Sequence, residues 1–251
     1  MVLGAAIRAA GNGPCREAGP RVSALRYTGR VPALDSLPLT SRYLSQLPKG
    51  LDSYPDAQIK GSVVRTVLEH LPEGFELERL PPELGGLLEH PPLASEWVPD
   101  APMVALTYAF RDVFFQTDEA YFAWLESGYV KMLDSRLYRI IMALSSPERL
   151  AKGADKRWGA LRRGSVRELI HSDERHNIGV VRYPESLFPR FHAVNFMSAL
   201  LVAYRLSRAR KPRVDLLEWT PTQMTLRVIY DEDKPPPGAD MSLRWPRSDE
   251  D

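Results

Sequence analysis

The chain has 251 residues, of which 44% are hydrophobic and 26% charged, a balance that excludes a wholly disordered protein. The 33 Lys and Arg residues against 32 Asp and Glu leave a net charge of +1, which gives no overall attraction to nucleic acid or to an anionic membrane. No apolar run reaches the length of about 18 residues that a spanning helix needs, so we expect no transmembrane segment. The single cysteine, Cys15, excludes an internal disulfide and favours a cytoplasmic protein.

Both ends of the chain lack the patterning of a folded domain. Residues 1–57 contain Gly, Pro, Ser and Arg without sustained hydrophobic periodicity, which predicts a disordered basic tail. A targeting segment and an overextended start are the alternatives for this stretch. The run Pro235-Pro236-Pro237-Gly238 interrupts regular structure, so we expect residues 232–251 to form an acidic, Pro-rich tail. The predicted domain therefore spans residues 58–231.

The first part of this domain is predicted to be helical, because apolar residues recur there at spacings of three and four. The expected helices cover residues 63–71, 102–114, 118–144 and 147–161. Ser62, Thr117 and Ser146 stand at the first, third and fourth of these helices as candidate N-caps. The helix at 118–144 is the longest, so we expect it to be the central helix of the domain.

The second part is predicted to contain two hairpins separated by one helix. The expected strands cover residues 166–171, 178–183, 214–219 and 224–230, and the helix begins at Pro189. Alternation is clearest in the last strand, where Leu226 should face the core and Arg227 the opposite side. The order of elements predicts an α+β fold in which helices cover an antiparallel sheet of about four strands.

Several of these features resemble a known group of proteins. They are the segment Ile59-Lys60-Gly61-Ser62-Val63, the long central helix, the Trp158 helix that runs into Arg162-Arg163-Gly164-Ser165, and the closing helix and hairpin. Together they resemble a paralogous family of myxobacterial proteins. That family is similar to the ligand-binding fold of four-vinyl-reductase domains, haem–nitric-oxide sensor domains and transport-protein-particle subunits. The resemblance implies a cavity between helices and sheet for a small or lipidic molecule, used for sensing or assembly.

The same comparison argues against a cofactor. Haem sensors of this fold carry a Tyr-x-Ser-x-Arg signature in the sheet hairpin, where this chain reads Val180-Val181-Arg182-Tyr183-Pro184. Four-vinyl-reductase domains commonly place cysteines near the last strands, and no cysteine follows Cys15 here. We therefore expect neither haem nor a metal–thiolate site.

Tyr129, Trp158 and His192 are the candidates for lining a ligand cavity. A filled core is favoured over a cavity for Tyr129 and Trp158, and a core-edge position is favoured over a catalytic one for His192. His171 and His176 flank one turn and could approach each other near Asp173, but an exposed polar turn is the expected structure there. No metal site is therefore predicted.

Two groups of basic residues are candidates for a binding surface. Arg162 and Arg163 follow a helix into a strand, and Arg208, Arg210 and Lys211 follow another helix. Cations at a helix C-terminus stabilise the helix without any partner. If the two groups share a face, they could bind phosphate, an acidic protein or nucleic acid. Nucleic acid is the least favoured partner, because stacking aromatics and a groove-reading element are not identifiable.

The sequence contains no nucleophile elbow and no Gly-rich phosphate loop, so we assign no catalytic residue. The favoured function is a non-enzymatic sensing or scaffold role, with a small apolar ligand, a protein partner or a second copy of the chain. The alternatives are an enzyme acting on a hydrophobic small molecule and a module that binds through its basic surface.

Overall fold

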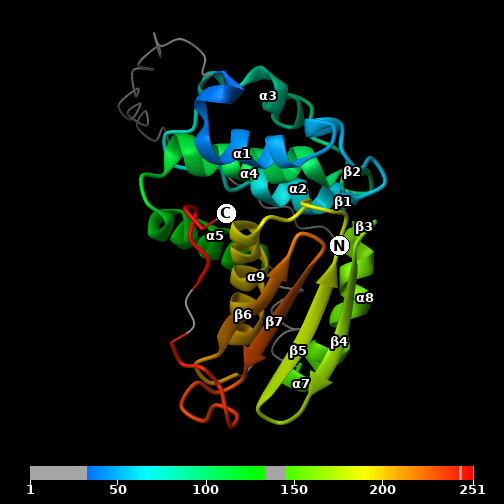
Figure 1. Ribbon diagram of the computed structural model, residues 1–251, viewed down its shortest axis with the longest axis vertical. Coiled ribbons are helices and arrows are strands. Elements are labelled where there is room, and N and C mark those ends of the chain that lie inside the picture. Colours follow the sequence, from blue (N-terminus) through cyan, green and yellow to red (C-terminus); the bar gives the residue numbers. More distant parts are fainter. Residues whose placement is uncertain (1–32, 134–144, 208, 243–244, 251) are drawn as a thin grey trace, which may run out of the picture. The chain divides into compact units, whose positions relative to one another are not determined.

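The structure is a computed structural model that describes residues 33–133, 145–207, 209–242 and 245–250. It has an α+β fold, as predicted, with helices packed around two antiparallel sheets (Figure 1). In the described part of the chain, no helix combines the length and the apolar character needed to cross a membrane.

The larger sheet has four strands in the order β4-β5-β7-β6, and every neighbouring pair is antiparallel. Its strands are β4 (Val166–Ser172), β5 (His176–Arg182), β6 (Arg213–Thr220) and β7 (Gln223–Ile229). Both predicted hairpins are confirmed, because β4 pairs with β5 and β6 pairs with β7. Between the hairpins the chain forms a short 3₁₀ turn at Arg190–His192 and then helix α9 (Ala193–Leu206).

Helix α9 covers one face of this sheet (Figure 1). Met224, Leu226 and Val228 of β7 are buried, which confirms the predicted alternation. Arg227 lies on the opposite face, but it is not simply solvated. Its guanidinium donates to the buried carboxylate of Asp215 at 2.8 Å. The outer face therefore contains a buried ionic contact that the alternation did not predict.

The helical part is built around α4 (Asp100–Phe114) rather than around the predicted central helix. Ten residues of α4 are buried, against four in α5 (Asp118–Leu133). The predicted extension of α5 from 134 to 144 lies outside the described residues. Thr117 caps α5 by accepting a hydrogen bond from the Ala120 backbone at 3.3 Å, as predicted.

The remaining helices differ in detail from the prediction. They are α2 (Gly61–Leu68), α3 (Pro82–Glu89), α7 (Pro147–Lys152) and α8 (Ala154–Leu161). Ser146 is confirmed as the N-cap of α7. Ser62 is not an N-cap, because α2 already begins at Gly61. The predicted single helix over 147–161 is divided at Gly153 into α7 and α8.

A second, three-stranded sheet was not predicted. It consists of β1 (Gln58–Lys60), β2 (Trp97–Pro99) and β3 (Arg162–Arg163), in the order β2-β1-β3. Strands of two or three residues are too short to show alternation, so the sequence pattern gave no signal. Gly164 follows β3 at a φ of +69°, and a Cβ there would lie 2.6 Å from the Cα of Ala57. The chain can therefore leave this sheet only through a glycine.

Residues 33–57 are part of the fold, so the prediction of a disordered tail over 1–57 is wrong for this portion. They form 3₁₀ turns at Leu34–Ser36 and Gly50–Asp52 and the helix α1 (Pro38–Gln46), which packs against α4. Leu39, Tyr43 and Leu47 are buried in the hydrophobic core. The Tyr43 hydroxyl also donates to the carbonyl of Leu187 at 3.2 Å. Residues 1–32 lie outside the described part.

The C-terminal segment also returns to the domain instead of leaving it after Asp231. The Trp245 ring lies 5.5 Å from the ring of Phe122. The Ser248 backbone donates to the Asp118 carboxylate at 3.0 Å, and Arg247 forms ion pairs with Asp118 and Glu119. Residues 245–248 therefore contact the first turns of α5, which a free acidic tail would not do.

The burial of α1 can be tested by truncating its central side chain. We expect Tyr43→Ala to lower the free energy of unfolding by about 3–5 kcal/mol, because it removes a fully buried ring and its hydrogen bond. Gln46→Ala, at an exposed position of the same helix, should change it by less than about 0.5 kcal/mol. Urea unfolding of both variants measures the difference. Equal, small effects would show that α1 is not part of the core.

Candidate functional site

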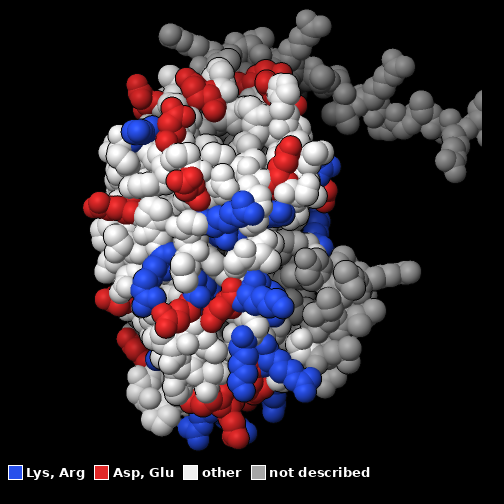
Figure 2. Space-filling view, turned by 90° about the vertical axis from the view of Figure 1, so that its right-hand side faces the viewer, with Lys and Arg blue, Asp and Glu red and all other residues white. Residues whose placement is uncertain are grey.

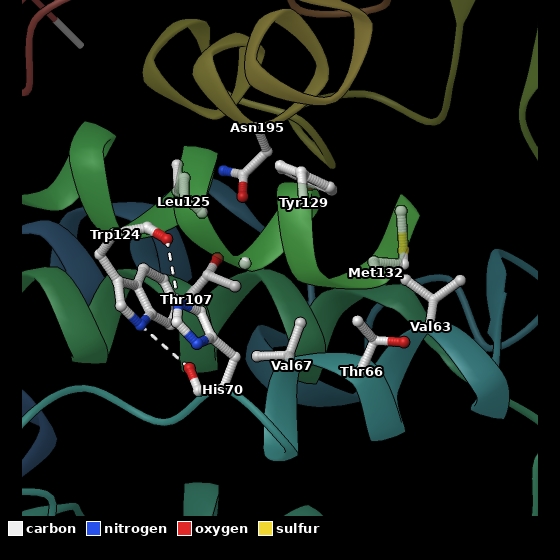
Figure 3. Close-up of a pocket in the computed structure, with 11 residues that line it drawn as sticks. Val63, Thr66, Val67, His70, Thr107, Trp124, Leu125, Tyr129, Met132 and Asn195 are labelled. Atoms are coloured by element: carbon white, nitrogen blue, oxygen red, sulfur yellow. Dashed lines mark hydrogen bonds between the residues drawn. The ribbon is translucent and has the colours of Figure 1, made fainter. Parts of the chain in front are cut away.

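A pocket with a volume of about 50 Å³ lies between α2, α4, α5 and α9 (Figure 3). Its lining is mainly apolar, and none of the lining residues carries an acidic, lysine or arginine side chain. The lining residues are Val63, Thr66, Val67, His70, Thr107, Trp124, Leu125, Gly128, Tyr129, Met132 and Asn195. The pocket therefore favours a neutral, mainly apolar occupant.

One wall of the pocket is held by reciprocal hydrogen bonds between His70 and Trp124. The Trp124 indole N–H donates to the His70 carbonyl at 2.9 Å, and His70 Nε2 lies 3.3 Å from the Trp124 carbonyl. The two rings stack with centroids 5.8 Å apart and an interplanar angle of 7°. These contacts join the segment after α2 to α5, and Figure 3 shows both hydrogen bonds beside the pocket.

The surroundings of His70 keep its imidazole neutral. Nδ1 lies 3.0 Å from the Lys131 ammonium, which can only donate, so Nδ1 accepts and Nε2 carries the proton. Nε2 is then the donor toward Ser127 Oγ at 2.7 Å. Partial burial, followed by the Lys131 charge, lowers the pKa of His70 below its ordinary value. Both ring nitrogens are thus engaged in contacts within the protein.

Neutral polar groups occupy the opposite side of the pocket. Figure 3 shows the Asn195 side chain extending from α9 between Leu125 and Tyr129, toward Thr107 of α4. Burial raises the pKa of Tyr129 to about 12, so its hydroxyl stays protonated at neutral pH. The pocket therefore offers amide and hydroxyl groups to an occupant, and no formal charge.

A series of buried polar groups begins at Asn195 and continues away from the pocket. The Asn195 amide lies 3.4 Å from Nδ1 of His192, while Nε2 of His192 is buried without a hydrogen-bond partner. The imidazole stacks on Phe188 with centroids 5.2 Å apart. Burial, followed by the nearby Arg162 charge, holds the pKa of His192 well below its ordinary value. His192 is therefore neutral in the folded protein.

The last members of this series of polar groups are Arg162 and Asp100, which form an ion pair. The Arg162 guanidinium donates to the fully buried Asp100 carboxylate. It also lies over the rings of Phe188, Phe196 and Trp158, at 5.0, 5.3 and 5.5 Å from their centroids. Burial raises the pKa of Asp100, and the adjacent Arg162 opposes that shift. Neither Arg162 nor Asp100 lines the pocket, so the pocket itself contains no charged side chain of this ion pair.

The three predicted cavity residues have different positions. Tyr129 lines the pocket, and His192 lies one residue behind it through Asn195. Trp158 does not line it. Its ring packs 5.2 Å from Phe196, and its indole N–H points at Ser165, with the hydroxyl at 3.2 Å. The filled-core alternative therefore describes Trp158.

Among the candidate basic residues that the structure describes, three are engaged in contacts within the protein. Arg162 is largely covered, with its side chain 12% exposed, and it pairs with Asp100. Arg163 stacks over the Trp97 ring at 4.0 Å, and Lys211 forms an ion pair with Asp233 at 3.1 Å. The backbone of Arg210 forms a β-bridge with Asp231, and the residue is exposed. Arg208 lies outside the described residues.

The two basic groups also lie at opposite ends of the larger sheet. Arg163 precedes Val166, which pairs with Arg182 at one end of the β4–β5 ladder. Lys211 precedes Arg213, which pairs with Ile229 at the other end. Strands of this length separate the ends by about 20 Å. On the face shown in Figure 2, Lys and Arg side chains gather in the middle and lower part with some Asp and Glu among them, and acidic side chains predominate above. A shared anion-binding surface is therefore not supported.

Sequence reasoning did not identify His70, Trp124, Asn195 or Asp100. His70 and Trp124 are 54 positions apart, so their mutual hydrogen bonds had no local signal. Asn195 did have one, because it is a polar residue inside the apolar stripe of α9, and a buried polar side chain requires a partner.

No family model matches this chain, and no curated protein sequence matches it. The resemblance to the myxobacterial family and to its related ligand-binding folds therefore remains a hypothesis. The case for function depends on the geometry of the pocket.

The neutrality of His192 predicts a pH dependence of stability. The unfolded chain binds a proton at His192 below a pH of about 6.5, and the folded protein does not. The contribution of His192 to the free energy of unfolding should therefore be greatest above that pH. It should decrease as the pH falls toward 5, by up to about 1.4 kcal/mol per pH unit.

His192→Phe retains an aromatic ring beside Phe188 and removes the titration, so the variant should show a smaller slope of urea midpoint against pH. His70 and His176 also have lowered pKa values, so the comparison with the parent isolates His192. His90→Ala, at an exposed position, is the control. An unchanged slope in His192→Phe would assign the pH dependence to other groups.

Proposed function

We propose that this chain is a non-enzymatic binding domain, with a sensing or scaffold role, whose pocket takes a small, neutral, mainly apolar molecule. The observation that carries the proposal is the combination of an uncharged, mainly apolar lining with one buried amide, Asn195, at its wall. Apolar surface supplies affinity, and a single oriented polar group fixes the direction in which a ligand lies.

The volume limits the size of the ligand. A single water needs a cavity of at least about 10–15 Å³. A pocket of about 50 Å³ therefore holds a few waters or a molecule of a few heavy atoms. Drug-sized ligands occupy sites of about 300–1,000 Å³. A larger ligand would therefore require the side chains around the pocket to move.

The proposed binding role is of the same type as the sensing role that the family resemblance implies, but the position of the cavity differs. The resemblance implies a cavity between helices and sheet. Here α9 packs on β6 and β7, and Met197, Met224 and Leu226 of these elements are buried. The pocket lies among four helices instead. A ligand would therefore contact α2, α4, α5 and α9 and would leave the sheet interface unchanged.

The enzyme alternative has less support from the same residues. His192 is the buried neutral base nearest to the pocket, but it does not line it, and Asn195 stands between. His70 does line the pocket, yet Lys131 and Ser127 already engage its ring nitrogens. A general base must reach the substrate proton directly or through one water. Binding without chemistry is the simpler function for this arrangement.

The test uses two small probes and a variant that fills the pocket. Xenon reports the apolar volume, and propan-2-ol adds one hydroxyl that the Asn195 amide can meet. We expect both to shift the NMR signals of pocket residues in the parent protein. Val67→Phe should weaken both effects at least tenfold, because the larger ring occupies the volume. Leu93→Phe, at an exposed apolar position, should leave them unchanged.

Asn195→Leu separates the two parts of the proposal, since it should weaken propan-2-ol binding more than xenon binding. Urea midpoints for each variant confirm that the fold is retained. Native mass spectrometry of the purified parent would report any retained mass and the subunit number. Equal probe binding by the parent and Val67→Phe would contradict the proposed site.

A further inference from the structure

The turn between β4 and β5 brings three potential metal ligands together, far from the pocket. One ligand atom each from His171, Asp173 and His176 lies within 4.8 Å of the other two. His171 Nε2 is 3.0 Å from Asp173 Oδ2, and His176 Nδ1 is 3.1 Å from Asp173 Oδ1. The two imidazole rings lie with centroids 4.6 Å apart. Both histidines therefore face the same carboxylate.

A β-bulge in β4 creates this arrangement. The register shifts between Leu169 and His171, so that His171 pairs with Ile178. Ile178 is two residues from His176 in β5, and residues two apart share a face of a strand. Regular pairing would have placed His171 opposite Asn177, on the buried face of the sheet. The extra residue therefore re-aims His171 toward His176, which is a common use of a bulge beside a site.

The backbone of the turn fixes the carboxylate. Asp173 Oδ1 accepts hydrogen bonds from the backbone N–H groups of Arg175 and His176, at 2.8 and 2.9 Å. Oδ2 contacts only His171 among the interactions in the described chain. Arg227, which lies on the same face of the sheet, donates to Asp215 through two nitrogens. The carboxylate is thus oriented before any ion arrives.

The donor set selects the class of ion. Two imidazole nitrogens and one carboxylate oxygen are ligands typical of Zn²⁺ and its neighbours among the first-row transition metals. Ca²⁺ and Mg²⁺ require many oxygen ligands, which three side chains with two nitrogens do not supply. Three protein ligands also leave a coordination position for water.

We propose that the β4–β5 turn binds one divalent transition-metal ion through His171, Asp173 and His176, with water completing the coordination. The ion links the last residue pairs of one hairpin and neutralises the carboxylate at the turn. None of the three ligands lines the pocket, so the two sites are separate. The competing structure is a polar turn held by hydrogen bonds alone, which needs no metal.

Zinc titration into the untagged, EDTA-treated full chain tests the proposal. We expect one Zn²⁺ per chain by calorimetry, and a visible d–d absorption when Co²⁺ replaces it. His171→Ala and His176→Ala should each weaken binding at least tenfold. Asp173→Asn should also weaken it, while its amide oxygen still accepts the two backbone hydrogen bonds and so preserves the turn. His90→Ala, an exposed histidine elsewhere, should bind as the parent does.

Urea midpoints measured without metal should be alike for the parent and the single variants, because the histidine variants alter the end of a hairpin. Added Zn²⁺ should raise the midpoint of the parent and of His90→Ala only. No stoichiometric Zn²⁺ on the parent, or binding that survives both His171→Ala and His176→Ala, overturns the proposal and leaves a hydrogen-bonded turn.

Discussion

The buried ion pair between Arg162 and Asp100 is the contact on which the architecture depends. Asp100 begins α4 directly after β2, and Arg162 begins β3, so one contact joins the small sheet to the most buried helix. The carboxylate stands at the N-terminus of α4, where the helix dipole favours negative charge. A backbone hydrogen bond from Asp100 to Ala57 at 2.8 Å fastens the same point to the residue before β1.

Such a pair is stable only while both partners remain. Removing one charge from water is expensive, and a buried pair that loses one partner leaves the other uncompensated. Arg162 has additional partners in the three aromatic rings that surround its guanidinium. Its charge also acts outward, because it helps to hold His192 neutral. Burial is the main reason that His192 is neutral, and the Arg162 charge adds to it.

How much could be predicted from the sequence depended on the range of the signal. The alternation of Leu226 and Arg227 and the caps at Thr117 and Ser146 are local, and the structure confirms them. Helix α1 was missed because the polar composition around it obscured a stripe of three apolar residues spaced by four, Leu39, Tyr43 and Leu47. The tertiary contact with α4, rather than composition, decides that this segment folds.

Of the candidate site, only Tyr129 and the neighbourhood of His192 were accessible to sequence reasoning. Two other features of the site differ in how far the sequence could have revealed them. They are the wall formed by His70 and Trp124, and the hydrogen bond from Asn195 to His192. The first joins residues 54 positions apart and had no pattern to reveal it. The second lies within three positions, and the requirement that a buried amide be satisfied could have found it.

The adjacent arginines of β3 show why residue type alone did not predict a surface. Side chains of successive strand residues point to opposite faces, so pairing of β3 with β1 separates Arg162 from Arg163. Arg162 is directed to Asp100 and is largely covered, whereas Arg163 remains exposed over Trp97. A two-residue strand is too short to be recognised in a sequence, yet its register decides which of two identical cations enters the core. The positive φ at Gly164 then turns the chain toward β4, the first strand of the larger sheet.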